Sequence, residues 1–312
     1  MQIEIARSGV NPTDVKARSN LRLPIPDGLI QVPHHDGSGV IRAVGAGVKE
    51  FTPGQRVWTH LAAYRRLDGT AQQFVTLATD LVAALPDHAS HELGAALGVP
   101  FLTAHRLLTL RAGGPEELGP GALTGTVVLV AGGAGAVGNA SIQLAKWAGA
   151  TVVTTVSSPE KAELATAAGA DHVIDYRREN VVARVRRIAP EGVDIVVEVS
   201  PAVNARIDFG VVASSGTLAI YANDGGTDLA ITVQDAMWLN LQIGFVILYT
   251  LRASERAAAV RAIVRALETQ AIGIGPRYGL PVRTFGLDEA SAAHSAVENG
   301  FIGKVQLAVA EL

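Results

Sequence analysis

The stretch that decides the expected fold reads Gly133-Ala134-Gly135-Ala136-Val137-Gly138. An apolar run at residues 126–131 precedes it, and a helix-like stretch at residues 139–148 follows it. A strand, a glycine turn and a helix in this order are typical of dinucleotide-binding proteins, because glycines let the backbone approach a pyrophosphate at the positive end of the helix. The alternative is a glycine-rich turn that binds no ligand.

Strand-like and helix-like segments alternate after this turn. We expect strands at 126–131, 151–156, 172–175, 193–199, 216–221 and 243–249, and helices near 137–148, 159–168, 179–189, 202–213 and 254–270. Such alternation predicts an α/β fold with a doubly wound parallel sheet of the Rossmann type. The segment before residue 84 is β-rich, a helical pattern from about Ser90 is interrupted at Pro100, and the chain closes on a helix begun by Asp288 and a strand at 304–310.

The end of the second expected strand indicates which dinucleotide binds. An NAD-selecting strand usually ends in Asp or Glu, which accepts a hydrogen bond from the ribose 2′-hydroxyl. Here the strand runs into Ser157, Ser158, Pro159, Glu160 and Lys161. Hydroxyl and ammonium groups suit a 2′-phosphate, which favours NADPH over NADH. Ser158 and Pro159 also fit the start of a helix, and both interpretations can hold together.

Composition excludes several classes of function. The chain has 312 residues, 48% of them hydrophobic and 18% charged, a net charge of −3 and no cysteine. It therefore has no disulfide, iron–sulfur cluster, thiolate zinc site or cysteine nucleophile. The slightly acidic balance argues against nucleic-acid binding. Residues 236–251 are apolar but too short for a membrane span, so we interpret them as a buried strand with flanks, and a cytoplasmic protein is expected.

Several further motifs occur in order along almost the whole chain. Together with the glycine turn, they resemble the zinc-free quinone oxidoreductase group, which includes zeta-crystallin, of the medium-chain dehydrogenase/reductase superfamily. The segments that carry this resemblance are 9–14, 36–45, 53–57, 94–106, 132–138, 169–176 and 303–305.

The resemblance implies a domain organisation. It implies a GroES-like β-rich catalytic domain made of residues 1–100 and 252–312, with a Rossmann NADPH-binding domain at residues 101–251 between them. Members of the group usually begin further upstream with a β-hairpin, which is missing before residue 3 here. The group is commonly dimeric, which implies a homodimer through the edge strand expected at 243–249.

The resemblance also implies site residues. Asn11 matches the asparagine near the nicotinamide, in a candidate catalytic set of Asn11, Asp14, Lys16 and His35. Lys16 stands where several relatives have a tyrosine. The implied cofactor-binding residues are Thr103, Gly133, Gly135, Ala136, Val137, Gly138, Ser157, Lys161, Tyr176, Phe245 and Val246.

A catalytic metal ion is not expected. Zinc-dependent relatives have a cysteine where this chain has Asn11, and a His-Glu pair where it has His35 and Asp36. Amides are poor zinc ligands, and no cysteine can complete the set. His35 then has two interpretations: a residue of a polar turn, or a donor of a proton or hydrogen bond to a carbonyl oxygen.

These residues predict NADPH-dependent reduction of quinones without zinc. A quinone or a conjugated enone accepts hydride with less polarisation than a simple ketone, for which zinc normally supplies the polarisation. The first alternative is an enoyl or enone reductase with the same fold and cofactor. An alternative of another class is an NADPH-binding structural or RNA-binding protein, which the zeta-crystallin resemblance allows.

Overall fold

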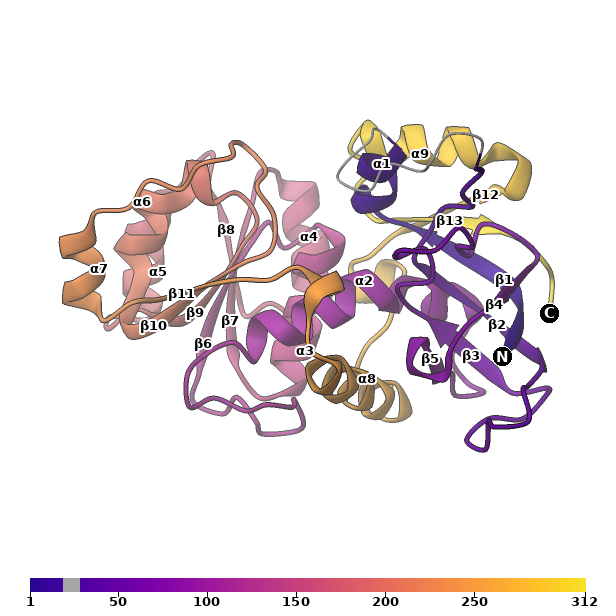
Figure 1. Cartoon of the computed structure of the whole chain (residues 1–312). Helices are drawn as coiled ribbons and strands as arrows, with labels where there is room; N and C mark the ends of the chain where they lie inside the picture. Colours follow the sequence, from indigo (N-terminus) through magenta and orange to yellow (C-terminus); the bar gives the residue numbers. More distant parts are fainter. Residues whose placement is uncertain (19–28) are drawn as a thin grey trace. The chain divides into compact units, whose positions relative to one another are not determined.

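The computed structural model describes residues 1–18 and 29–312 and divides the chain into two compact units (Figure 1). The first unit consists of Met1–Pro100 and Pro281–Leu312, and the second of Phe101–Leu280. We expected the chain to return to the first unit at residue 252, and it returns at Pro281. The reason is that the helix following residue 252 belongs to the second unit, where Arg265 donates to the carbonyl oxygen of Leu118 at 2.7 Å.

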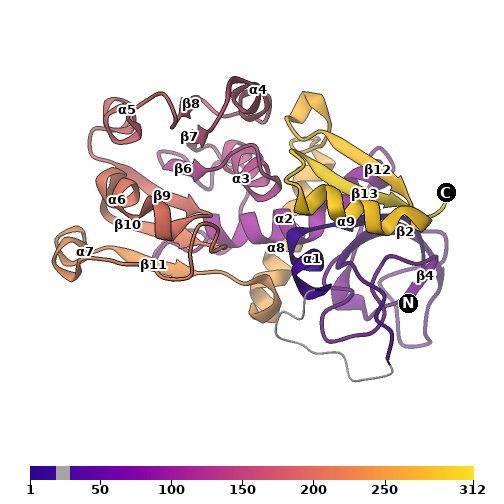
Figure 2. The same cartoon turned by 90° about the horizontal axis from the view of Figure 1, so that it is seen from above.

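The second unit contains a six-stranded parallel sheet in the order β11-β10-β9-β6-β7-β8. The strands are β6 (Val127–Ala131), β7 (Thr151–Val156), β8 (His172–Asp175), β9 (Val193–Glu198), β10 (Val212–Ile220) and β11 (Gln242–Phe245). The helices are α3 (Ala136–Trp147), α4 (Pro159–Ala167), α5 (Val181–Ile188), α6 (Pro201–Val211), α7 (Val233–Leu239) and α8 (Ala253–Glu268). Helices α3 and α4 cover one face of this sheet, and α5 and α6 cover the other (Figures 1 and 2). The expected doubly wound Rossmann sheet is confirmed.

The central strands of this sheet are apolar because both of their faces are covered by helices. Val128, Val130, Val152 and Val196 are fully buried. Short apolar runs, and not a two-residue periodicity, are therefore the signal that predicts these strands.

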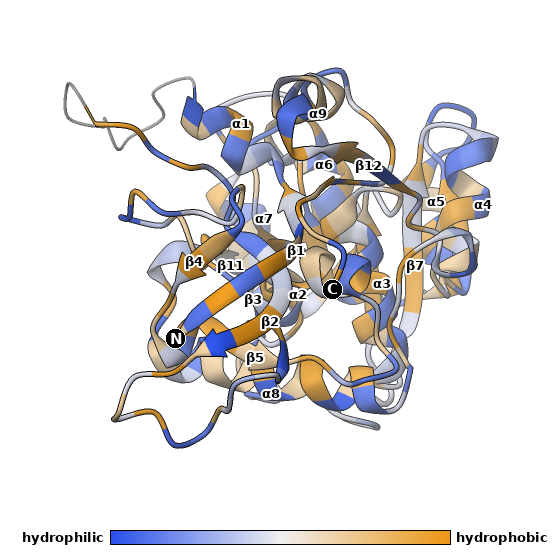
Figure 3. Cartoon of the chain, turned by 90° about the vertical axis from the view of Figure 1, so that its right-hand side faces the viewer, coloured by the Kyte–Doolittle hydropathy of each residue, from blue (hydrophilic) through white to orange (hydrophobic). Residues whose placement is uncertain are grey.

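The first unit is built around strand β1, which pairs with three other strands. Its strands are β1 (Gln2–Val10), β2 (Asp36–Ala43), β3 (Arg56–Thr59), β4 (Phe74–Thr76), β5 (Val82–Ala84), β12 (Val282–Gly286) and β13 (Lys304–Ala308). They form one sheet in the order β12-β13-β1-β2-β3-β5, with β4 also paired to β1. Hydrophobic and hydrophilic residues alternate along the first half of β1 (Figure 3). This pairing brings the two ends of the sequence into one β-rich unit, as expected for the GroES-like domain.

The helices of the first unit are short. They are α1 (Pro12–Arg18) and α9 (Ala290–Glu298), and helix α2 (His91–Leu108) extends past the end of the unit. We expected an interruption at Pro100, but α2 is continuous through it. A proline removes one helical hydrogen bond without necessarily ending a helix, and a carboxylate contacts α2 at the residue before Pro100, as described below.

The apolar stretch at residues 236–251 differs from our expectation of a buried strand. Its first part belongs to helix α7, β11 ends at Phe245, and a 3-10 turn follows at Leu248–Thr250. The Phe245 side chain, at the end of β11, is 71% exposed, and β11 is an edge strand of its sheet. Among the described residues, no helix combines the length and the apolar character that crossing a membrane requires.

Candidate active site

Two glycines of the turn between β6 and α3 have no room for a side chain. A Cβ atom at Gly138 would overlap the carbonyl oxygen of Gly132, and one at Gly133 would overlap the Thr154 hydroxyl. Helix α3 begins after Gly135, which has no side chain to cap it. The first amides of α3 have no acceptor within the helix. The turn therefore fits an anion such as a pyrophosphate, and Ala136 and Val137 supply amides at that position.

Three predicted phosphate-binding residues lie at the carboxyl ends of β7 and β8. The Lys161 ammonium donates to the Ser157 hydroxyl at 3.0 Å. The backbone amide of Tyr176 donates to the carbonyl oxygen of Val156 at 3.0 Å, and the Tyr176 side chain is half exposed. Ser158 caps helix α4 by accepting from the Lys161 amide, so the capping interpretation of this segment is confirmed.

The three residues predicted to line the nicotinamide pocket all belong to the second unit and differ in exposure. Thr103 in α2 and Val246 after β11 are buried, whereas Phe245 is exposed. The Val246 amide donates to the carbonyl oxygen of Ile220 at 2.7 Å, which fixes the backbone at the end of β11. Their contact with nicotinamide stays a prediction.

In the first unit, the residues between β1 and α1 begin a buried polar cluster. Asn11 and Asp14 are 2% and 3% exposed. The Asn11 amide donates to Asp14 Oδ2 at 2.7 Å, and the Asp14 amide donates to the Asn11 carbonyl oxygen at 3.0 Å. Burial raises the pKa of Asp14 to about 7, although the hydrogen bond from Asn11 and the charge of Lys304 oppose the shift.

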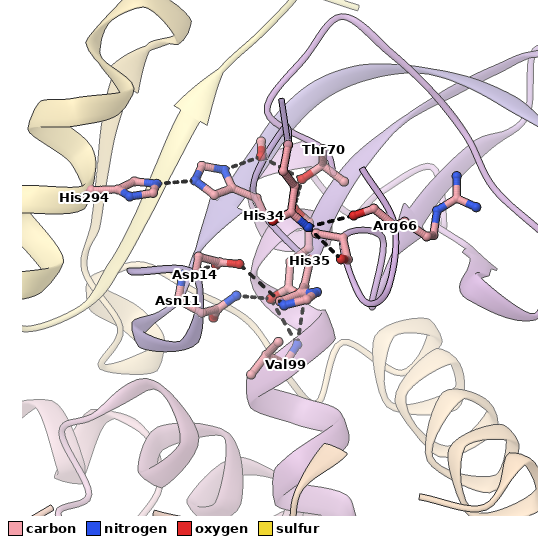
Figure 4. Close-up of polar contacts among 12 residues, drawn as sticks. Asn11, Asp14, His34, His35, Arg66, Thr70, Val99 and His294 are labelled. Atoms are coloured by element: carbon pink, nitrogen blue, oxygen red, sulfur yellow. Dashed lines mark hydrogen bonds and ion pairs between the residues drawn. The ribbon is translucent and has the colours of Figure 1, made fainter. Parts of the chain in front are cut away.

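Asp36, the first residue of β2, is the centre of this cluster and is fully buried. Its Oδ2 accepts from Asn11 Nδ2 at 2.8 Å, and the Val99 amide in α2 donates to Oδ1 and Oδ2 at 2.9 and 3.0 Å (Figure 4). The Lys304 ammonium lies 3.5 Å from Oδ2 and donates to Asn11 Oδ1 at 2.6 Å. Burial raises the pKa of Asp36, and Lys304 and Asn11 partly reverse that shift.

His35 lies directly before β2, with its Nε2 3.8 Å from Asp14 Oδ1 (Figure 4). It is buried, with 7% exposure, in the bend that leads into β2, which agrees with a polar turn at this position. Burial lowers the pKa of His35 to about 4, so the imidazole is neutral at neutral pH. Whether it donates to a substrate carbonyl stays a prediction.

A chain of hydrogen bonds supports the backbone beside His35. His34 Nε2 lies 2.7 Å from His294 Nε2, and His34 Nδ1 lies 2.8 Å from the Ser8 hydroxyl (Figure 4). Ser8 lies 2.7 Å from the Thr70 hydroxyl, which donates to the Asp36 carbonyl oxygen at 2.6 Å. Since Thr70 uses its only proton on Asp36, each earlier member must donate toward Thr70. The chain thus places a proton on His34 Nδ1, and burial lowers the pKa of His34 to about 3, so this imidazole is neutral and its Nε2 accepts from His294.

The structure brings together three of the four predicted catalytic residues: Asn11, Asp14 and His35. Lys16 lies on the surface of α1 and is exposed. Sequence reasoning missed Lys304 as a member of the cluster, which is 1% exposed. One signal was available: Lys304 opens a strand whose other residues are mostly apolar, and it follows a glycine within a motif that we had noted.

Comparison with known proteins identifies the family. Residues 1–87 match the family described as alcohol dehydrogenase GroES-like domain, and residues 136–265 match the one described as zinc-binding dehydrogenase. The chain is 28% identical over 313 residues to the quinone oxidoreductase of Sus scrofa, with 98% of this chain and 88% of that protein covered.

Solved structures show the same likeness. A structure of Escherichia coli quinone oxidoreductase complexed with NADPH is 26% identical, with a TM-score of 0.78 and coverage of 98% of this chain and 90% of that chain. An NAD-dependent alcohol dehydrogenase is also 26% identical, with a TM-score of 0.84 and coverage of 99% and 91%.

The chain therefore belongs to the medium-chain dehydrogenase/reductase superfamily, and its likeness to quinone oxidoreductases supports an oxidoreductase that uses a nicotinamide cofactor.

Zinc, which the name of the second family implies, does not fit the residues present. The described residues contain no group of three or more His, Cys, Asp or Glu that could hold a metal ion. The buried carboxylate of Asp36 contacts the Lys304 ammonium and the Asn11 amide instead. A neighbouring ammonium repels a divalent cation, and structural or catalytic zinc sites use thiolate, imidazole or carboxylate ligands.

Proposed function

We propose that the protein reduces quinones with NADPH and without a metal ion. The observation that carries the choice of cofactor is the 3.0 Å contact between the Lys161 ammonium and the Ser157 hydroxyl, beside the half-exposed Tyr176. These groups lie at the carboxyl ends of neighbouring parallel strands, where dinucleotides bind in this fold. An ammonium and hydroxyl groups suit the 2′-phosphate that distinguishes NADPH from NADH.

The substrate class follows from the cation that lies beside the buried Asp36 carboxylate. Reduction of a simple ketone needs strong polarisation of the carbonyl, which a bound metal ion can supply. Here the cation beside Asp36 is the buried Lys304, whose ammonium already pairs with Asp36 and donates a hydrogen bond to Asn11. A quinone is electron-poor and accepts hydride with less assistance. The relatives named quinone oxidoreductase support the same choice.

Reduction of a quinone to a quinol requires one hydride and one proton, and NADPH supplies the hydride when bound. In our proposal, Asp14 and His35 supply the proton. Asp14 has a pKa of about 7, which is below the value of about 10 for a phenolic oxygen, so proton transfer to the quinol oxygen is favourable. His35, whose Nε2 lies 3.8 Å from Asp14 Oδ1, relays the proton: one ring nitrogen gives its proton to the substrate oxygen while the other takes the proton of Asp14, so the imidazole stays neutral.

The experiment that tests this function is NADPH consumption by purified protein. A small quinone and an α,β-unsaturated ketone are supplied in parallel, each with NADPH, with NADH and after exhaustive treatment with a chelator. We expect quinone turnover with NADPH, little with NADH, and no loss after chelation. Turnover of the enone alone would support the enone-reductase alternative. Binding of NADPH without turnover of either substrate would contradict the proposal.

We further propose that the protein forms a homodimer through β11. This strand ends the order of its sheet, and an edge strand presents unpaired backbone groups to a partner. Phe245 and Ile247 are 71% and 55% exposed at this edge. Light scattering should give a dimer mass for the wild type and a monomer mass for the double variant Phe245→Lys/Ile247→Lys. Val203→Lys, on the exposed surface of α6, is the control and should remain dimeric.

A further inference from the structure

Lys304 is a buried cation whose position is fixed by the backbone on both sides. It opens β13, where its amide donates to the carbonyl oxygen of Pro281 at 2.8 Å, and Val305 pairs with Val10. The preceding Gly303 has a φ of 137°, and a Cβ atom there would overlap the Pro281 carbonyl oxygen. Only glycine fits this backbone, which leads directly into Lys304 at the start of β13.

The ammonium of Lys304 meets two different oxygen atoms. It donates to Asn11 Oδ1 at 2.6 Å and lies 3.5 Å from Asp36 Oδ2. The other end of the Asn11 amide donates to the same Asp36 oxygen at 2.8 Å. Asn11 therefore bridges the lysine and the carboxylate, and the amide has one orientation, with its oxygen toward Lys304 and its nitrogen toward Asp36.

The opposite charges of Lys304 and Asp36 balance each other. Both oxygens of Asp36 accept hydrogen bonds from the Val99 amide, which is the pattern of an ionised carboxylate. The ammonium of Lys304 supplies one positive charge against it. Since an unpaired buried charge is strongly destabilising, each member of the pair requires the other.

We propose that the Lys304 ammonium occupies the position that a divalent metal ion would take beside Asn11, His35 and Asp36. It thereby excludes metal from this site. The inference rests on the metal-free part of the proposed function. An ammonium is a compact point charge with three donors, which can hold a carboxylate and an amide oxygen at once. With 1% exposure it does not reach a substrate, so Lys304 is a positioning residue.

The test introduces a strong zinc ligand into the cluster, once with the Lys304 ammonium present and once with it removed. Asn11→Cys supplies a thiolate beside His35 and Asp36 and keeps Lys304, whereas the double variant Asn11→Cys/Lys304→Met also removes the ammonium. Each protein is incubated with zinc chloride and desalted, and its zinc content and free thiol are measured. We expect background zinc in the wild type and in Asn11→Cys, and about one zinc per chain with a protected thiol in the double variant.

Two results would overturn the inference: about one zinc per chain in Asn11→Cys while Lys304 is present, or no zinc in a double variant that melts cooperatively. Zinc content needs no turnover. Failure of quinone reduction by the metal-free wild type would therefore contradict the proposed function alone, and zinc uptake by Asn11→Cys would contradict this inference alone.

A second measurement tests the inference if the double variant Asn11→Cys/Lys304→Met does not fold. Lys304→Met and Asp36→Asn should each lower the melting temperature of the protein. The combined variant Lys304→Met/Asp36→Asn should lower it by less than the sum of the two, because both members of the charge pair are removed together. Simple additivity of the two shifts would overturn the pairing on which the inference depends.

Discussion

The backbone amide of Val99 donates to the carboxylate of Asp36 from inside helix α2, at 2.9 Å to Oδ1 and 3.0 Å to Oδ2. Two neighbours make this contact possible. Pro100 has no N–H, so the regular ladder of α2 is already broken beside Val99. Gly98 has no side chain, and a Cβ atom there would overlap Asp36 Oδ1. The helix and strand β2 are thereby held together at the buried carboxylate.

Gly98→Ala should therefore destabilise the protein, although glycine-to-alanine changes within helices usually stabilise by about 0.5–1 kcal/mol. The added methyl group must displace the Asp36 carboxylate, and we expect the free energy of unfolding to fall by roughly 1–3 kcal/mol in urea denaturation. Gly45→Ala is the control, because nothing lies within 4 Å of the added atom there. An unchanged or higher stability of Gly98→Ala would show that Asp36 is free to move.

Cofactor selection should depend on Lys161. Replacing it with alanine removes a charged donor beside Ser157, and a hydrogen bond to a charged group is worth about 1.5–3 kcal/mol. We expect the KM for NADPH to rise by about tenfold to a hundredfold, with no matching change for NADH. The matched control is Lys49→Ala, since Lys49 is exposed in the first unit. Equal changes for both cofactors would place the 2′-phosphate elsewhere.

The strands of the second unit were predicted within a few residues, because buried parallel strands carry short apolar runs between recognisable helix starts. Ser158 and Asn180 cap α4 and α5 with their side chains, which are local signals. Helices α1 and α7 were not predicted. Each has only seven residues, too few for a helical periodicity to stand out from the background.

The contacts of the candidate site were predicted between residues that are close in sequence and were missed between residues that are far apart in sequence. Ser157 and Lys161 are four residues apart on either side of the start of α4, so the turn into the helix brings them together. The contact between Lys304 and Asn11 joins residues 293 positions apart, and it exists only because β13 pairs with β1. No spacing rule connects such residues before the topology of the sheet is known.

Proton supply during quinone reduction should depend on His35 and not on Lys16. His35→Gln interrupts the path from Asp14, and general acid catalysis contributes about 10²–10⁴-fold, so we expect kcat to fall within that range. Lys16→Met should change kcat little, because Lys16 is exposed on α1. In the wild type, kcat should fall as the pH rises through about 7, where Asp14 loses its proton. A large loss of kcat in Lys16→Met, together with an unchanged kcat in His35→Gln, would show that the proton comes through Lys16 and not through His35.

A buried pair of carboxyl groups in the second unit gives a separate pH dependence. Glu198 accepts from Asn204 Nδ2 at 3.0 and 3.2 Å, and the Ser200 amide also donates to it, so Glu198 is the ionised member. Asp208 then holds the proton and donates it to Glu198. Burial first, and the charge of Glu198 second, raise the pKa of Asp208 to about 9.

The sign of the effect follows from the two states of Asp208. In the unfolded chain this carboxyl loses its proton near its ordinary pKa of 3.8, whereas the folded protein keeps the proton up to about 9. The unfolded state therefore binds fewer protons in this interval, and the contribution of Asp208 to stability decreases as the pH rises through it.

Asp208→Asn cannot ionise and still offers an N–H donor to Glu198. We expect the stability of the variant relative to the wild type to increase steadily from pH 5 to pH 9 in urea denaturation. The exposed Asp235→Asn is the control and should follow the wild-type curve. Parallel curves for Asp208→Asn and the wild type would mean that Asp208 is already ionised in the folded protein at neutral pH.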